Sequence, residues 1–176
     1  MSTIHSLPSD AQALPAEQTT RPNGARLWRL SLILTMIGIV ISGYLTYTKL
    51  TGTSVACVKE IGNCDAVQAS IYGYLGGYGG IPVAYVGLAG YLAIFGLLML
   101  ENRIRLLRRY GKIVLFVLTL GGFLFSAYLV TVSLFILHES CQWCLASAAT
   151  MTTLFLISFF RVWQAIGAVP DEADAE

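Results

Sequence analysis

The chain has 176 residues, of which 56% are hydrophobic and only 12% are charged, and its formal net charge is +1. Soluble domains of this length carry about 25% charged residues, so the composition excludes an ordinary soluble domain. The net charge alone excludes little, but the positions of the charged residues are informative.

Four stretches lack Asp, Glu, Lys and Arg, and each is long enough for a helix to cross a hydrocarbon core of roughly 30 Å. They are Leu30–Thr48, Ile81–Leu100, Ile113–Leu137 and Gln142–Phe160. We predict an all-α membrane protein, a four-transmembrane-helix bundle occupying residues 26–163, with an outer loop or short helix capping the active site. The expected spans are about 28–48, 81–100, 113–137 and 141–162. A very hydrophobic soluble bundle is the alternative, but such runs make poor soluble helix surfaces.

The two ends of the chain read as tails. Residues 1–25 are rich in Ser, Thr, Pro, Ala and Gln, which predicts a disordered segment, and residues 164–176 form an acidic tail. Nine of the eleven basic residues precede the first span, separate the second from the third, or follow the fourth. The positive-inside rule makes that side cytoplasmic, so both tails are expected there. The basic segment Glu101–Lys112 is expected to contact anionic headgroups rather than nucleic acid.

The connection between the first two spans, residues 49–80, is far longer than a tight turn, and loops of this length are usually functional. It contains Cys57, Cys64 and a Gly/Tyr-rich stretch that begins at Ser70. Ala66–Tyr72 could form a short helix on the membrane surface. The tyrosines suit an interfacial aromatic belt but could also line a ligand site. They are Tyr72, Tyr74 and Tyr78.

A second cysteine pair, Cys141 and Cys144, opens the fourth span. We expect Ser140 to cap this helix, and a cysteine in the first turn to meet the positive end of the helix dipole, which favours thiolate. The i, i+3 spacing places both sulfurs near one face, which suits a reversible disulfide. His138 could tune these thiols or simply be solvated. Trp143 could pack on a planar ligand or anchor the helix at the interface.

The four cysteines allow three interpretations. They could relay electrons, they could staple the loop of a non-catalytic membrane scaffold, or they could form a Cys₄ metal site in a metal-binding membrane component. C-x-x-C motifs serve zinc, haem and redox proteins alike. Haem attachment needs a His where Leu145 stands, and six residues between Cys57 and Cys64 are many for a zinc knuckle. We therefore favour redox cysteines and expect no metal.

Taken together, these features resemble the vitamin K epoxide reductase family, bacterial branch, over roughly residues 26–161. The resemblance rests on four spans and on Cys57, Cys64, Ser70, Gly80-Ile81-Pro82 and Cys141-x-x-Cys144. In the four-span oxidoreductases similar to the disulfide-bond B protein, the C-x-x-C motif comes in the first external loop. Here the order of the two pairs is reversed.

The resemblance implies a thiol:quinone oxidoreductase that supports disulfide bond formation. It would lie in a bacterial inner membrane with its cysteines on the extracytoplasmic side. Cys57 would meet a soluble thioredoxin-like (DsbA-like) partner, and the freed Cys64 would exchange disulfides with Cys141. Cys144 would then pass electrons to menaquinone or ubiquinone. Many bacterial members carry a fused thioredoxin-like domain, and because this sequence stops at Glu176 we expect a separate partner.

The resemblance also suggests residues beside the quinone. Ser70 matches a loop Ser/Thr that helps to hold the site, and Trp143 is a further candidate. Ala148 stands where the vertebrate enzyme has a tyrosine, and Gly76 lies near the position of its asparagine. Without these polar contacts, we expect an ordinary quinone rather than vitamin K epoxide as the substrate.

Overall fold

The computed structural model describes residues 22–58, 62–77, 79–101 and 105–166. In chain order the elements are α1 (Pro22–Thr51), α2 (Cys64–Ala69), the 3-10 turn η1 (Ile71–Gly73), β1 (Tyr74–Leu75), β2 (Ile81–Pro82), α3 (Val83–Leu100), α4 (Arg105–Val132), the π-helical segment η2 (Ser133–Leu137) and α5 (Gln142–Ile166). Within these residues, four helical segments are long and apolar enough to cross a membrane: Ala25–Thr51, Val83–Leu100, Gly111–Leu137 and Gln142–Gln164. The predicted all-α four-helix membrane bundle is confirmed.

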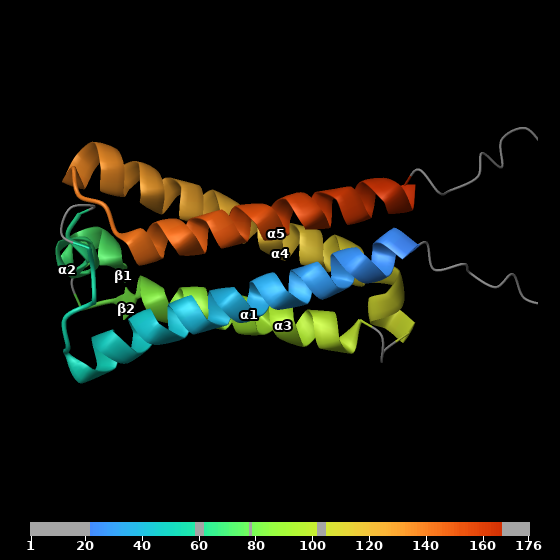
Figure 1. Ribbon diagram of the computed structural model, residues 1–176, viewed down its shortest axis with the longest axis horizontal. Helices are drawn as coiled ribbons and strands as arrows, with labels where there is room; N and C mark the ends of the chain where they lie inside the picture. The colour runs from blue at the N-terminus through green and yellow to red at the C-terminus, as the bar shows by residue number, and fades with distance from the viewer. Residues whose placement is uncertain (1–21, 59–61, 78, 102–104, 167–176) are drawn as a thin grey trace, which may run out of the picture.

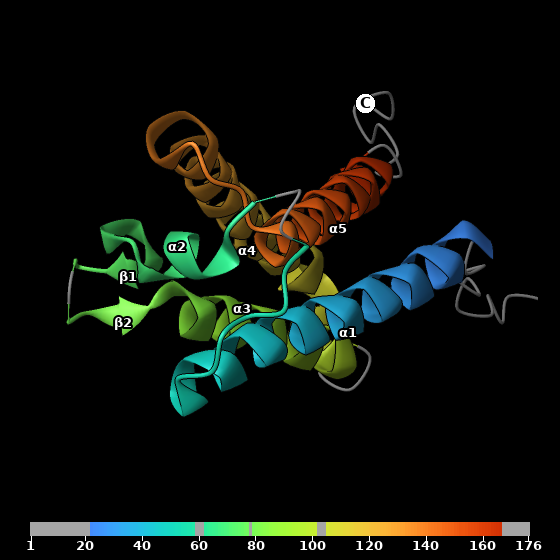
Figure 2. The ribbon, with the colours of Figure 1, turned by 60° about the vertical axis from the view of Figure 1, so that its left-hand side comes forward.

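The four long helices run side by side along the longest axis of the molecule (Figure 1). α1 packs on α3 and α5, and α4 packs on α5 and α3. One end of the bundle, here called the base, is where α1 begins, α5 ends and α3 leads to α4. The other end, called the cap end, carries α2, the two strands and the connection from α4 to α5 (Figure 2). Both cysteine pairs therefore belong to the same end of the bundle.

The starts of α4 and α5 differ from the expected spans, and each difference changes where functional or basic residues lie. α4 begins at Arg105, so basic residues of the α3–α4 connection lie on the first turns of a helix and not in a loop. α5 begins at Gln142, one residue after the expected start, which leaves Cys141 just outside the helix. The predicted tails fall almost wholly outside the described residues, and so does Tyr78.

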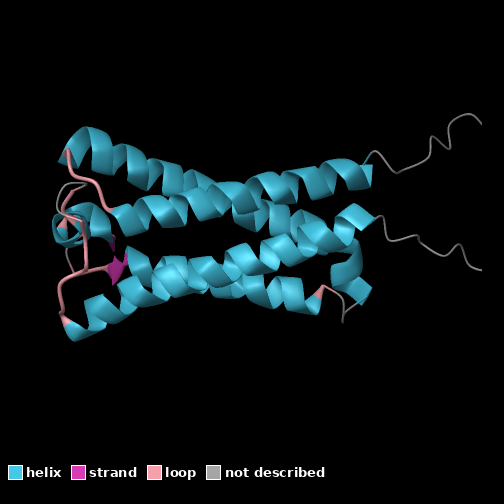
Figure 3. Ribbon diagram, in the orientation of Figure 1, coloured by secondary structure: helices cyan, strands magenta, loops and turns pink. Residues whose placement is uncertain are grey.

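The cap is built from short elements (Figure 3). The single helix expected around Ala66–Tyr72 is divided into α2 and η1 at Ser70, whose extended backbone, with φ −64° and ψ 160°, interrupts the helical turns. β1 and β2 pair antiparallel, with Tyr74 opposite Pro82. Gly76 in the connecting turn has φ of 88°, a conformation that glycine adopts without steric cost.

The apolar core lies in the membrane-spanning part. Its buried members are Tyr91, Ile94, Leu98, Leu115, Met151 and Leu154. α1 approaches α3 closely at Gly38, where any Cβ atom would overlap the ring of Tyr91. The Tyr91 hydroxyl donates to the Ser147 carbonyl oxygen at 2.9 Å, so the ring reaches from α3 to α5 and links three helices.

A nearly buried ion pair ties the helices together at the base. Arg161 Nη2 donates to both carboxylate oxygens of Glu101, at 2.8 and 2.9 Å, and each side chain is only 10% exposed. Trp28 Nε1 donates to the Leu98 carbonyl oxygen at 3.3 Å. These contacts fix the ends of α1, α3 and α5 relative to one another.

Candidate active site

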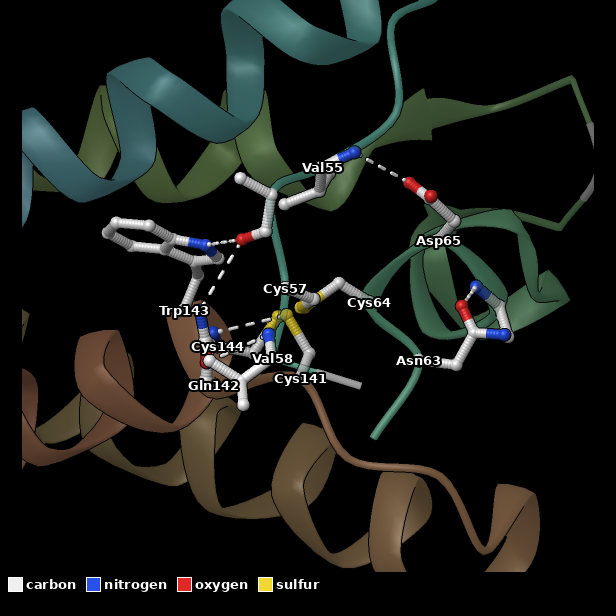
Figure 4. Close-up of a disulfide and its surroundings, with 12 residues drawn as sticks. Val55, Cys57, Val58, Asn63, Cys64, Asp65, Cys141, Gln142, Trp143 and Cys144 are labelled. Carbon is white, nitrogen blue, oxygen red and sulfur yellow. Dashed lines mark hydrogen bonds between the residues drawn. A yellow bond between two sulfur atoms is a disulfide. The ribbon is translucent and has the colours of Figure 1, made fainter. Parts of the chain in front are cut away.

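All four cysteines gather at the cap end (Figure 4). Cys57 lies in an extended segment after α1, residues 53–58, here called the strap. Cys64 is the first residue of α2. Cys141 immediately precedes α5, and Cys144 lies in its first turn. Packing of the strap and α2 against the start of α5 thus brings together two pairs that are distant in sequence.

Cys57 and Cys64 form a disulfide, with their Cα atoms 6.2 Å apart, whereas Cys141 and Cys144 are free thiols. The two bonded sulfurs differ in accessibility, because Cys57 is half-buried and Cys64 is only 1% exposed. Disulfide exchange requires access of a thiolate to the sulfur that it attacks. A thiolate from another protein can therefore approach Cys57, while Cys64 is covered.

The closed disulfide also bears on the alternative of a Cys₄ metal site. A thiol–metal bond needs a thiolate, so a Cys₄ site would require all four cysteines to be reduced. In the arrangement described here only Cys141 and Cys144 are free. The chemistry that this arrangement offers directly is exchange between a disulfide and a dithiol.

Cys64 and Cys141 share a buried cluster with Leu45 and Val55, and Cys141 is also only 1% exposed. In Figure 4 the sulfur atoms of both pairs lie together between the strap and the start of α5. Two buried cysteines from different pairs are thus neighbours, shielded from bulk thiols. This arrangement suits electron transfer from one pair to the other.

Cys141 caps the N-terminus of α5 with its own sulfur. The Cys144 backbone N–H donates to Cys141 Sγ at 3.4 Å, and the Leu145 N–H donates to the Cys141 carbonyl oxygen at 2.9 Å. The prediction that Ser140 would be the N-cap is wrong, because α5 begins one residue later than expected. A side-chain acceptor here satisfies an otherwise unpaired helical N–H, and a sulfur anion meets the positive end of the helix dipole.

Local hydrogen bonds lower the pKa of the Cys141 thiol. The hydrogen bond from the Cys144 side chain lowers the pKa of Cys141 to about 7, aided by the backbone N–H groups of Cys144 and Trp143. Burial and the negative charge of Asp65 act in the opposite direction. Because the thiolate is the attacking form, Cys141 is a competent nucleophile near neutral pH.

Trp143 holds the strap in place. Its Nε1 donates to the Ala56 carbonyl oxygen at 2.8 Å, and the Ala56 N–H donates to the Tyr44 hydroxyl at 2.9 Å. The rings of Tyr44 and Trp143 lie 5.0 Å apart. On the other side of the strap, the Val55 N–H donates to Asp65 Oδ1 at 2.9 Å. The strap that carries Cys57 is therefore attached to α1, α2 and α5.

A cavity of about 140 Å³ lies beneath the cap, between the ends of the long helices. Of the predicted quinone-site residues, Ser70 and Ala148 line it, together with Cys144. Trp143 is absent from its described lining, and Gly76 lines a separate hollow beside the strand pair. Cys144 is the one cysteine among the described lining residues, so the cluster of four sulfurs meets the cavity at this residue.

Lys49 and Gln68 are among the polar cavity residues that were not predicted from the sequence. Lys49 is the only charged residue among the described lining residues. Its Nζ donates to the backbone carbonyl oxygen of Gln68 at 2.7 Å and to the Tyr74 hydroxyl at 3.1 Å. Gln68 also lines the cavity. In the sequence, Lys49 is one of the two basic residues that lie on the side opposite to the other nine. Its isolation, on the side with few basic residues, was the signal that could have singled it out.

Other expectations concerned Tyr72, Tyr74 and His138. Tyr72 lines the cavity, whereas Tyr74 is absent from its described lining and contacts it through Lys49, whose Nζ lies 4.7 Å from the centre of the Tyr74 ring. His138 is exposed and ends η2 with a left-handed backbone, φ 54° and ψ 25°. The exposed position of His138 agrees with the solvated interpretation.

Three observations suit the cavity to a small ring-shaped ligand. A cavity of about 150 Å³ is known to hold benzene, so one six-membered ring has room. The lining is mostly apolar, as in small-molecule sites generally. Finally, Gln68 Nε2 is buried without a hydrogen-bond partner among the described residues, and leaving such a donor unpaired costs about 1–3 kcal/mol. A carbonyl acceptor in the cavity would remove that cost.

The sequence matches a known protein family. Residues 29–159 match the model of the vitamin K epoxide reductase family. The matched region begins in α1 and ends in α5, so it includes both cysteine pairs, the cap and most of each membrane-spanning helix.

Proposed function

Because the chain belongs to the vitamin K epoxide reductase family and is a membrane thiol–disulfide oxidoreductase, we propose that it oxidises a separate soluble protein and reduces a membrane quinone. The soluble partner is a thioredoxin-like (DsbA-like) protein, and the quinone is menaquinone or ubiquinone. The product of the reaction is an oxidised partner that can introduce disulfides into other proteins.

One observation carries this proposal, namely the order of the four sulfurs. Cys57 lies half-exposed on the strap, Cys64 and Cys141 are buried together, and Cys144 lines an apolar cavity. Electrons that a soluble protein delivers at Cys57 thus have a route through the buried cysteines to the cavity between the membrane-spanning helices. A set of structural staples would not require one sulfur on the outer surface and another on a cavity.

The first exchange takes place at the strap. A thiolate of the partner attacks the Cys57 sulfur, which breaks the Cys57–Cys64 bond and releases Cys64 as a thiolate. The second thiol of the partner then attacks the mixed disulfide at the partner's own sulfur. The partner leaves with a disulfide, and Cys57 is released as a thiol.

The second exchange takes place inside the buried cluster. Cys64 attacks the Cys141 sulfur of a Cys141–Cys144 disulfide and releases Cys144. Cys57 then attacks Cys64, re-forms the first disulfide and releases Cys141. The net result is a Cys57–Cys64 disulfide and a Cys141/Cys144 dithiol, which is the pairing found here. The low pKa of Cys141 makes it a good leaving group in this step.

The quinone supplies an acceptor for the two electrons and two protons that leave this dithiol when it closes to a disulfide. Cys144, Ser70 and Ala148 would surround it in the cavity. Burial of Cys141 and the position of Cys144 direct the electrons to this cavity and away from soluble oxidants.

The bilayer orientation follows from the basic residues. Arg26, Arg29, Lys112 and Arg161 lie on helix segments near the base, while Lys49 lies at the cap end. We therefore place the base in the cytoplasm and the cap end on the extracytoplasmic side, where disulfides persist.

Trapping the partner tests the proposal. Cys64→Ala leaves Cys57 without its intramolecular partner, so a mixed disulfide between Cys57 and a soluble protein should accumulate in cells and disappear on reduction. Cys57→Ala/Cys64→Ala is the matched control and should give no adduct. A scaffold with structural disulfides predicts no adduct in either variant, and that result would refute the proposal.

A purified system supplies a second test. A reduced thioredoxin-like protein with a water-soluble ubiquinone should lose its thiols in the presence of the wild-type protein. Thiol loss that continues unchanged without Cys141 and Cys144 would show that the proposed route is wrong.

A further inference from the structure

Gln68 has an unusual position for an amide side chain. It lies on α2 and lines the cavity that Cys144 also lines. Its Nε2 atom is buried and has no hydrogen-bond partner among the described residues. Buried polar side-chain atoms in proteins are nearly always paired, so the unpaired donor of a cavity-lining residue points to a ligand acceptor.

Neighbouring residues hold Gln68 in this position. Lys49 Nζ donates to the backbone carbonyl oxygen of Gln68, and this hydrogen bond attaches α2 to the end of α1. Gly73 lies so close to the same carbonyl that any Cβ atom at this residue would overlap it. A charge-assisted hydrogen bond and close packing thus fix the backbone of Gln68. The position of its Cα atom, from which the side chain extends, is fixed with it.

Lys49 brings a positive charge to the same part of the cavity. An ammonium group has three N–H donors, and the described contacts of Lys49, with the Gln68 carbonyl oxygen and the Tyr74 hydroxyl, use two of them. No described carboxylate forms a salt bridge with it. Among the described residues, this side of the cavity therefore has an amide donor without a partner and a positive charge without a carboxylate partner.

We propose that Gln68 donates a hydrogen bond to a carbonyl oxygen of the quinone headgroup, and that Lys49 is a positioning residue that holds Gln68 and makes this wall positive. The inference rests on the proposed function. Ala148 and Gly76 offer the quinone no polar side chain. In this proposal Gln68 on α2 and Lys49 at the end of α1 supply the polar contacts instead.

A binding measurement tests Gln68 without turnover. In a Cys141→Ser/Cys144→Ser background, which cannot transfer electrons, a ubiquinone with one isoprenoid unit should raise the melting temperature of the detergent-purified protein. Gln68→Met keeps the side-chain length and removes the donor. We expect its dissociation constant for this ubiquinone to rise roughly tenfold, the loss of one hydrogen bond. Gln68→Leu should show the same loss.

The melting temperature without quinone separates a binding role from a structural one. Gln68→Met removes an unpaired buried amide, so the unliganded protein should melt at the same temperature or higher. If Gln68 were merely structural, the variant would melt lower and bind the quinone as tightly as the parent. Gln164→Met, at an exposed position of α5 near the base, is the matched control and should change neither quantity.

Lys49 is tested in the same assay. Lys49→Met should weaken quinone binding several-fold, and Lys49→Arg should restore part of it, because the arginine retains charge and donors. Lys112→Met, an exposed lysine of α4, is the control. Wild-type affinity in Gln68→Met, Gln68→Leu and Lys49→Met would overturn the inference alone. If the parent protein showed no quinone-dependent shift at all, the proposed function itself would fail.

Discussion

The base half of the bundle and the cap end differ in what surrounds their polar groups. At the base, Glu101 and Arg161 form a tight ion pair, in which Arg161 Nη1 is buried without a hydrogen-bond partner among the described residues. Below the cap the Tyr91 ring fills the space that Gly38 leaves open. At the cap end, by contrast, two thiols are free, and the cavity beside them is lined by Gln68, whose Nε2 has no hydrogen-bond partner among the described residues.

This difference assigns stability to one region and reactivity to the other. A well-packed core leaves no room for a substrate, whereas a cavity lined by a free thiol and an amide can hold a ligand. Changes at the cap end should therefore alter chemistry with little effect on folding, and changes in the core and at the base should do the opposite.

The largest expected effect comes from Cys144. Cys144→Ser should abolish quinone reduction by the partner, because the sulfur that lines the cavity is lost, while the melting temperature stays close to that of the parent. Turnover with a reduced thioredoxin-like protein and ubiquinone measures the first quantity. Substantial remaining turnover would show that electrons leave by another route.

Breaking the ion pair at the base should have a large effect on stability. Glu101→Gln leaves Arg161 nearly buried and without its charged partner, and such a loss costs about 3–5 kcal/mol. Thermal unfolding in detergent measures it, and the folded fraction should retain full turnover. Replacing both residues by apolar side chains, as in Glu101→Leu/Arg161→Met, should be less damaging than the single change.

Two glycines in the spans offer a matched pair of smaller changes. Gly38→Ala forces a methyl group into the Tyr91 ring, and overpacking of this kind costs about 1–3 kcal/mol. Gly90→Ala projects into open space, so it should be neutral or slightly stabilising. Equal melting temperatures for the two variants would contradict the close packing of α1 on α3.

The pH dependence of Cys141 tests the electrostatics of the cap end. Its thiolate absorbance, measured with Cys57–Cys64 oxidised, should rise with a midpoint at about pH 7. Cys144→Ala removes the main hydrogen-bond donor and should move the midpoint upward. Because folding lowers this pKa, the associated stabilisation is complete above the unfolded pKa of about 8.5 and is lost as pH falls through about 7. An unchanged midpoint in Cys144→Ala would refute the assigned cause.

The smallest expected effect concerns the strap. Trp143→Phe keeps an aromatic ring beside Tyr44 but removes the hydrogen bond to Ala56, which contributes about 0.5–1.5 kcal/mol. Partner oxidation should slow a few-fold while a single turnover of prereduced Cys141/Cys144 with quinone is unchanged. Trp163→Phe, at an exposed position near the base, serves as the control.

Local sequence was sufficient for the framework of the molecule. Long charge-free runs predict membrane helices because an unpaired charge in hydrocarbon is costly, and an even number of spans returns the chain to its starting side. The placement of both cysteine pairs at one end follows from these spans alone. The division of the cap helix at Ser70 and the start of α5 at Gln142 were missed, since single-residue boundaries depend on capping contacts that propensity does not fix.

What only the tertiary structure decided is which residues meet across the cap end. The hydrogen bond between Trp143 and Ala56 joins positions 87 residues apart, and Lys49 reaches Gln68 on another element. Such contacts depend on how the helices pack and on where the connecting segment folds back. Hydrophobic periodicity and composition therefore do not predict them. The sequence by itself therefore determined a membrane bundle with paired thiols at one end. Packing decided that Cys141 caps a helix and that Cys144 lines the cavity. It also decided that Gln68, whose Nε2 has no hydrogen-bond partner in the described part of the chain, lines the same cavity.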